Sequence, residues 1–282
     1  MTHVPVIDAQ VHCYGRNTPD SPWADPFPGP AEMTGEDMVK AMDEVGVNGA
    51  LLTSVFAIYR FDASYAIAVQ KKHPGRFALI KPVDANDPAV AETIAEWAAM
   101  PGTAGLRIMM RPEISGDPAD PGLNRILSAG ARHDLPVNIQ CWGRLPQVGV
   151  LAARNPATRI VVDHVGMTQV FAPPARPQPF DDLPNVLALA QHENVAIKIT
   201  GACTYSHETF PYRDIWDPLA RVFDAFGLER CLWGTDWTRA TALLTYKDGV
   251  DAFRVTDRLS DSDRATLMGG SLQKIYGWAP KK

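Results

Sequence analysis

The 282-residue sequence lacks the features of several large protein classes. No apolar run approaches the 18 or more residues that a membrane-spanning helix needs. The chain has 27 Lys and Arg against 32 Asp and Glu, and without a basic excess it is a poor candidate for bulk nucleic-acid binding. Residues 1–8 lack the basic start and long apolar stretch of a secretory signal. We therefore expect a cytoplasmic protein that binds neither membranes nor nucleic acid.

Cysteine is also scarce, and its spacing excludes two further classes. The four cysteines form no C-x-x-C pair and are spread along the chain as Cys13, Cys141, Cys203 and Cys231. This spacing argues against a disulfide framework and against a structural zinc knuckle. We expect reduced thiols that pack as small apolar groups. A nucleophilic Cys13 or Cys141 is a weak alternative, because no paired base can be identified.

Eight short, apolar, β-rich runs alternate with segments of helical period. The runs are Val4–Asp8, Gly49–Val55, Phe77–Val83, Ala104–Met110, Pro136–Trp142, Arg159–Gly166, Val195–Gly201 and Arg230–Trp237. They lack a clean polar/apolar alternation, which is typical of parallel strands buried on both faces. The sequence therefore predicts an α/β fold, a (β/α)8 TIM barrel that forms one domain over residues 1–282. An open doubly wound sheet is the runner-up, but no G-x-G-x-x-G or G-x-x-x-x-G-K motif follows any strand.

Helix signals fill the gaps between the strands. Thr34 is a plausible N-cap of a helix that ends before Gly46, and Ser260 with Asp263 resembles a capping box. Two proline-rich stretches, 17–30 and 172–184, each follow a predicted strand. We expect them at the barrel mouth, either as walls or lids of a site or as rigid spacers.

Polar residues interrupt the apolar strands near their carboxyl ends, where an α/β barrel carries its chemistry. They are Gln10, His12, Arg107, Asn138, Gln140, Asp163, His164, Lys198, Thr200 and Asp236. A buried polar group must be satisfied or functional. Among the histidines, His73 and His133 suit helix ends, whereas His12 and His164 end strands. We predict that His12, His164 and Asp236 form the catalytic centre.

Arginines and aromatic residues gather after the predicted strands. Arg16, Arg60, Arg111, Arg144 and Arg239 follow strands, and so do Tyr14, Trp23, Tyr59, Trp142 and Trp237. Each arginine alone reads as a solvated loop charge, but guanidinium groups match carboxylates bidentately, and the set predicts a small anionic substrate that contains a ring. The predicted substrate-binding residues are Arg107, Gln10, Gln140, Tyr59, Arg60, Trp142, Arg144 and Arg239. Arg107 could equally be a buried ion-pair partner.

Three motifs carry a resemblance to a known family. Asp8–His12 (DAQVH), Asp163–Gly166 (DHVG) and Trp233–Trp237 (WGTDW) resemble the strand 1, strand 6 and strand 8 motifs of the amidohydrolase superfamily. More narrowly, they resemble the branch that includes 2-pyrone-4,6-dicarboxylate lactonase and sugar lactonases, as does the closing segment Gly270–Gly277. The resemblance covers the whole chain in order. It implies a distorted barrel and hydrolysis of an ester, lactone or amide, with Asp236 as the general base.

The sequence departs from the superfamily where a metal would bind. The superfamily usually has His-x-His on strand 1, with both histidines as metal ligands, but the first position here is Gln10. Strand 5 offers Asn138 and Gln140 rather than histidine. Because an amide oxygen is a weak ligand for zinc, we favour a site without a metal or other cofactor. The alternative is one divalent metal, Zn or Mn, held by His12, His164 and Asp236.

The leading hypothesis is a hydrolase of a small, carboxylated lactone or cyclic ester. Asp236 would activate water, and His12 and His164, with Arg107, would stabilise the oxyanion. One alternative is a mononuclear metal-dependent hydrolase, decarboxylase or hydratase on the same barrel. Another is a non-catalytic barrel that binds a small acid. The sequence leaves the substrate's identity open, and it is compatible with a homo-oligomer.

Overall fold

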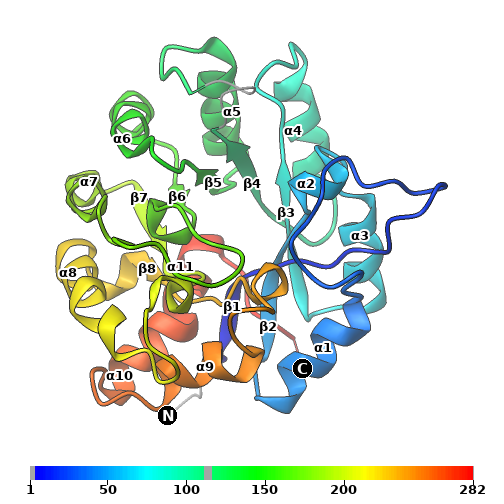
Figure 1. The fold of residues 1–282 in the computed structure, drawn as a ribbon. Coiled ribbons are helices and arrows are strands. Elements are labelled where there is room, and N and C mark those ends of the chain that lie inside the picture. The colour runs from blue at the N-terminus through cyan, green and yellow to red at the C-terminus, as the bar shows by residue number, and fades with distance from the viewer. Residues whose placement is uncertain (1–3, 111–115, 282) are drawn as a thin grey trace.

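The computed structural model describes residues 4–110 and 116–281, and its core is a barrel of parallel strands. The eight strands neighbour one another in chain order (Figure 1). They are β1 (Ile7–Val11), β2 (Gly49–Thr53), β3 (Phe77–Pro82), β4 (Thr103–Met109), β5 (Val137–Gln140), β6 (Ile160–Val162), β7 (Val195–Lys198) and β8 (Cys231–Leu232). The predicted (β/α)8 TIM barrel is confirmed. Each of the eight apolar runs overlaps a strand, although β1 begins three residues after the start of its run and β4 one residue before it.

Backbone hydrogen bonds join the first and last strands and so close the barrel. The amide of Ala9 donates to the carbonyl of Trp233 at 3.1 Å, and the amide of Asp236 donates to the carbonyl of Gln10 at 3.1 Å. The register of β1 against β2 shifts between Asp8 and Val11. Such an irregularity re-aims the side chains that follow it. The end of β1 can therefore direct Gln10 and His12 toward the residues of β6 and β8.

Helices surround the strands in the ring that a barrel requires (Figure 1). They are α1 (Gly35–Glu44), α2 (Phe56–Tyr59), α3 (Ser64–Lys72), α4 (Val90–Ala98), α5 (Pro121–Arg132), α6 (Leu145–Arg154), α7 (Leu183–Ala188), α8 (Trp216–Phe226), α9 (Tyr246–Arg254), α10 (Asp261–Ala265) and α11 (Ser271–Tyr276). Capping boxes at Thr34 and Ser260 confirm two predicted helix starts. His73 and His133 are helix C-caps, as expected. No helix in the described ranges is long and apolar enough to cross a membrane.

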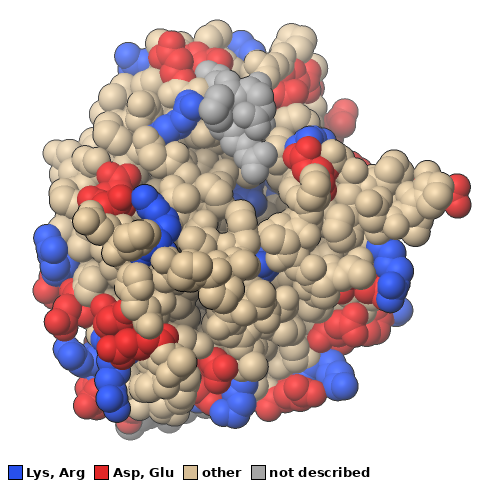
Figure 2. Space-filling view, viewed as in Figure 1, with Lys and Arg blue, Asp and Glu red and all other residues tan. Residues whose placement is uncertain are grey.

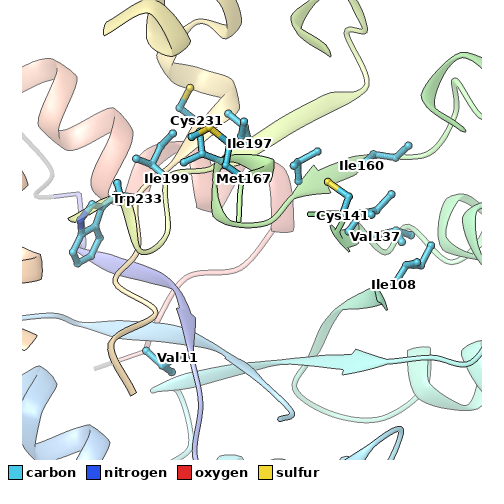
Figure 3. Close-up of a cluster of buried hydrophobic side chains, with 14 of the residues drawn as sticks. Val11, Ile108, Val137, Cys141, Ile160, Met167, Ile197, Ile199, Cys231 and Trp233 are labelled. Atoms are coloured by element: carbon cyan, nitrogen blue, oxygen red, sulfur yellow. The ribbon is translucent and has the colours of Figure 1, made fainter. Parts of the chain in front are cut away.

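The apolar core has two layers. The larger one packs the strands against the outer helices, and Figure 3 shows part of it around Ile108, Ile197 and Trp233. The smaller one gathers Ile7, Leu51, Ala78, Val161 and Leu232 from five strands against Leu272 and Tyr276 of α11. Helix α11 therefore closes one end of the barrel interior with apolar side chains. All four cysteines are buried and free, which confirms their expected role as packed thiols.

Candidate active site

The polar strand ends meet in a cavity of about 140 Å³ at the carboxyl end of the barrel. His12, His164 and Asp236 line it, together with Arg107 and Arg239. The remaining lining residues are Pro26, Phe27, Pro28, Val55, Phe56, Ala57, Met109, Gln140, Trp142 and Phe171. Figure 2 shows the hollow near the centre of this face, with basic side chains in it. The proline-rich stretch 17–30 thus supplies part of the wall.

His12, which follows β1, is fixed by a backbone carbonyl. Its Nδ1 lies 2.7 Å from the carbonyl oxygen of Thr53. Because a carbonyl can only accept, Nδ1 carries a proton and donates it. His12 Nε2 therefore faces the site, 3.3 Å from Asp236 Oδ1 and 3.5 Å from the amide nitrogen of Gln10. The ring is 5% exposed, so only a small molecule in the cavity can reach it.

His164, which follows β6, is a neutral imidazole. Burial lowers its pKa to about 4, because the nearby carboxylates Asp236 and Asp163 do not offset the loss of water. Its Nδ1 lies 2.9 Å from the hydroxyl of Thr200 and 3.4 Å from Asp236 Oδ2. Its Nε2 lies 3.3 Å from a guanidinium nitrogen of Arg107, which can only donate. Nε2 is therefore the acceptor, and Nδ1 carries the proton.

Asp236, just beyond β8, is fully buried and surrounded by partners that hold its charge. Burial alone would raise the pKa of this carboxyl, but Arg239, His164 and His12 outweigh it and hold the pKa well below its usual range. Arg239 forms an ion pair with Asp236 Oδ2. It also donates to the carbonyl of Val170 at 2.9 Å. Asp236 is therefore ionised across the working pH range.

Two site residues adopt a backbone conformation that side chains other than glycine rarely take. The φ angles are 55° at His164 and 49° at Asp236. Each such residue costs about 1–3 kcal/mol, and residues of this kind cluster at functional sites. The barrel supports both: Tyr205 donates to the carbonyl of His164 at 2.7 Å, and the amide of Asp236 bonds to Gln10. The strain turns both side chains toward the cavity.

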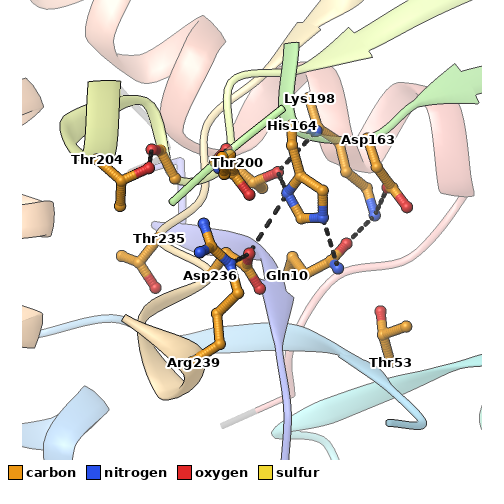
Figure 4. Close-up of polar contacts among 12 residues, drawn as sticks. Gln10, Thr53, Asp163, His164, Lys198, Thr200, Thr204, Thr235, Asp236 and Arg239 are labelled. Carbon is orange, nitrogen blue, oxygen red and sulfur yellow. Dashed lines mark hydrogen bonds and ion pairs between the residues drawn. The ribbon is translucent and has the colours of Figure 1, made fainter. Parts of the chain in front are cut away.

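A second buried charge cluster lies next to these three residues (Figure 4). Asp163 of the β6 end binds Arg107 Nε at 2.8 Å and Lys198 Nζ at 3.0 Å. Burial raises the pKa of Asp163, but these two cations outweigh it and lower the pKa well below the usual range. Lys198 of β7 also donates to Gln10 Oε1 at 2.8 Å. Because the oxygen of Gln10 faces Lys198, its amide nitrogen faces the imidazoles of His12 and His164, 3.5 Å from Nε2 of each.

The side chains do not fit a divalent metal as they stand. The nitrogen of His164 that could ligate a cation faces donors from Arg107 and Gln10, and one oxygen of Asp236 is held by Arg239. A metal ligand must offer a lone pair, and the amide of Gln10 offers hydrogens instead. Within residues 4–110 and 116–281, no group of three or more His, Cys, Asp or Glu could hold a metal ion.

Of the predicted substrate-binding residues, some lie in or beside the cavity and the others lie outside it. Arg107, Gln140, Trp142 and Arg239 line the cavity with the trio His12, His164 and Asp236. Gln10 lies beside the trio and contacts both histidines.

Three others do not line the cavity. The hydroxyl of Tyr59 accepts from the amide of Gly15, Arg60 pairs with Asp25, and Arg144 occupies the N-cap position of α6 without a side-chain capping hydrogen bond. Arg111 lies outside the described residues.

Sequence reasoning left Lys198, Thr53 and Asp163 out of the site. Lys198 and Asp163 were visible as polar residues in apolar strands, and a fully buried lysine requires a buried partner. Thr53 acts through its backbone carbonyl, which no sequence pattern marks. Two cysteines considered as nucleophiles, Cys13 and Cys141, are buried, and burial raises the pKa of both thiols.

The chain is thus a (β/α)8 barrel that brings two histidines and an aspartate together at the carboxyl ends of strands β1, β6 and β8. The chain belongs to the amidohydrolase family, whose profile matches residues 7–278. The resemblance seen in the strand-end motifs is therefore confirmed.

Relatives agree with this assignment, and solved structures share the fold. An L-fucono-1,5-lactonase of Burkholderia ambifaria is 31% identical over 62% of this chain and 60% of its own length. A 4-sulfomuconolactone hydrolase of Rhizobium radiobacter is 25% identical over 82% of this chain and 74% of its own length. An amidohydrolase of Burkholderia multivorans, solved with bound zinc, has the same fold with a TM-score of 0.80. It is 22% identical, and the match covers 97% of this chain and 99% of that one.

Proposed function

We propose that this protein hydrolyses a small lactone or cyclic ester that carries a carboxylate, without a metal ion. The observation that carries the proposal is the convergence of Asp236, His12 and His164 with Arg107 and Arg239 in one cavity. Two relatives act on lactones by name, which supports the reaction class. The NH₂ group of Gln10 faces both histidines and can only donate hydrogen bonds, which supports chemistry without a metal.

Asp236 is the general base for water. It takes a proton from a water molecule, and the water oxygen forms a bond to the lactone carbonyl carbon. The tetrahedral intermediate then breaks the bond between that carbon and the ring oxygen. The leaving oxygen accepts the proton that Asp236 holds, and the product is a hydroxy acid. One lactone and one water are consumed, and Asp236 returns to its ionised form.

Arg239 sets the strength of this base. While the guanidinium is paired with Asp236, the carboxylate is a weak base, because the ion pair holds its pKa low. Nη2 of Arg239 is buried and has no hydrogen-bond partner within the described residues. A substrate carboxylate that binds against Arg239 in the cavity would share the positive charge and raise the basicity of Asp236. Substrate binding and activation of the base would then be coupled.

The oxyanion is stabilised by Arg107, with the histidines as hydrogen-bonding groups. Arg107 lines the cavity and holds a permanent charge next to His164. His164 is neutral, so it orients neighbours rather than supplying charge. Three cations, Arg107, Lys198 and Arg239, face two carboxylates, Asp163 and Asp236, in this buried cluster. The excess of positive charge favours an anionic substrate and an anionic transition state.

A lactone panel assayed after dialysis against a chelator tests this function. Each carboxylated lactone is paired with its methyl ester, and the carboxylate should have the higher kcat/KM because only it pairs with arginine. Activity should survive the chelator. Activity that a chelator abolishes and Zn²⁺ or Mn²⁺ restores would establish the metal-dependent alternative. Release of CO₂ would establish a decarboxylase, and binding without turnover would establish a binding protein.

A further inference from the structure

The amide nitrogen of Gln10, whose side chain is held by Lys198, occupies the point on which both active-site imidazoles converge. Nε2 of His12 and Nε2 of His164 each lie 3.5 Å from the amide nitrogen of Gln10. One amide nitrogen carries two hydrogens, one for each ring. Each Nε2 also has a second neighbour at 3.3 Å, Asp236 Oδ1 at His12 and a guanidinium nitrogen of Arg107 at His164. Two imidazole lone pairs that point at one position are the arrangement that a metal ion would otherwise satisfy. Here the position holds an N–H donor.

Lys198 decides which end of the Gln10 amide takes that position. The ammonium group has only donors, so it needs the oxygen of Gln10, which lies 2.8 Å away. Asp163 holds the ammonium from the other side at 3.0 Å, and the lysine side chain is fully buried. A reversed amide would place its NH₂ group against the ammonium and its oxygen against the two imidazole lone pairs. Both contacts would be repulsive, so the observed orientation is strongly preferred.

We infer that Lys198 is a positioning residue that, through Gln10, replaces a divalent metal with an internal cation. Lys198 supplies the positive charge, which Asp163 favours against the cost of burial, and Gln10 relays it as an N–H donor to His12 and His164. The relay adds an N–H donor at Nε2 of both rings, whose tautomers Thr53 and Arg107 fix, and it excludes a metal from the site. The inference rests on the metal-free chemistry proposed above, but its tests need no substrate. A failure of lactone hydrolysis would therefore leave these tests intact.

The first test reads the protonation sites of the histidines by ¹⁵N NMR. In the wild-type protein, Nε2 of His164 should give the signal of an unprotonated nitrogen. In Lys198→Met the Gln10 amide loses its anchor, so the Nε2 signals of both rings should move downfield, as expected when an acceptor nitrogen loses a hydrogen-bond donor. Lys247→Met, at an exposed ion pair with Asp251, is the matched control and should keep the wild-type signals. A folded Lys198→Met protein with wild-type histidine signals would overturn the inference.

The second test keeps Lys198 in place, so it stands even if Lys198→Met does not fold. Gln10→Glu retains an oxygen for Lys198 and turns a second oxygen, a metal ligand, toward the two imidazoles. This variant should retain stoichiometric Zn²⁺ or Co²⁺ after dialysis, and the Co²⁺ form should show a ligand-field spectrum. The wild-type protein should retain neither ion. Equal retention by wild-type protein and Gln10→Glu would show that Gln10 does not exclude the metal.

Discussion

The two ends of the barrel interior are built from the same strands but from opposite chemistry. The end near α11 packs Ile7, Ala78 and Leu232 against Leu272 without a charged group in that cluster. The other end buries Asp163, Asp236 and their cationic partners. Burying apolar surface stabilises a fold, whereas burying charge costs free energy unless each ion is paired. The closed end therefore contributes to the stability of the fold, and the mouth is the place of the proposed chemistry.

The largest expected effect is on turnover, and it tests whether the residues at the mouth of the barrel carry out the reaction. Asp236→Asn preserves shape but removes the base, so we expect kcat to fall about 10²- to 10⁴-fold. Steady-state kinetics on the true substrate measures it, with Asp224→Asn on the exposed face of α8 as the control. Near-normal turnover in a folded Asp236→Asn protein would remove this residue from the mechanism.

The next effect lies at the closed end and should change stability alone. Leu272→Ala leaves a cavity in the apolar cluster, and we expect it to lower the free energy of unfolding by about 2–5 kcal/mol. Urea unfolding measures the loss, and kcat of the folded protein should not change. Val255→Ala is the control, because Val255 is 62% exposed. A Leu272→Ala protein of normal stability but low kcat would contradict the division between the two ends.

A buried carboxyl outside the active-site cavity offers a third, smaller effect that depends on pH. Burial outweighs the hydrogen bonds from Thr235, Gln10 and Tyr246 and raises the pKa of Asp8 to about 6 from 3.8. The folded protein therefore binds this proton more tightly than the unfolded chain does. The stability it contributes is fully present below pH 3.8 and is lost as the pH rises through 6.

Asp8→Asn should remove this pH dependence. From pH 4.5 to 7.5, the stability of the wild-type protein relative to the variant should fall by about 2 kcal/mol. Urea unfolding at the two pH values measures the difference, with Asp224→Asn as the control. A difference that does not change with pH would mean that Asp8 titrates at its ordinary value in the folded protein.

The smallest expected effect concerns Arg60, which lies outside the cavity, and it tests how far the substrate site extends from the mouth. Arg60 is part of an ion pair with Asp25 in which both side chains are about 40% exposed, and such pairs contribute roughly 0–1 kcal/mol. Arg60→Ala should therefore change kcat/KM by less than about 2-fold, whereas Arg239→Ala should lower it strongly. A comparable loss in both variants would extend the substrate site to the rim.

The sequence alone was enough to predict the barrel and the convergence of His12, His164 and Asp236 in one cavity. Strands buried on both faces must be apolar throughout, so eight such runs were visible without any structure. Polar residues at the ends of those strands stood out for the same reason, and the carboxyl-end rule placed His12, His164 and Asp236 together. Prediction was weaker for Tyr59, Arg60 and Arg144, because a loop position after a strand does not determine where a long side chain points.

What only the tertiary structure decided is the orientation of polar groups between strands distant in sequence. Gln10 and Lys198 are 188 residues apart, and their contact determines that an amide nitrogen, not an oxygen, faces the histidines. The carbonyl of Thr53 fixes the tautomer of His12, and Arg239 holds the charge of Asp236. The burial of apolar residues can be predicted from composition and from the spacing of apolar residues, and both are properties of the local sequence. Hydrogen-bond direction depends on which donor meets which acceptor, and only the closed barrel brings those atoms together.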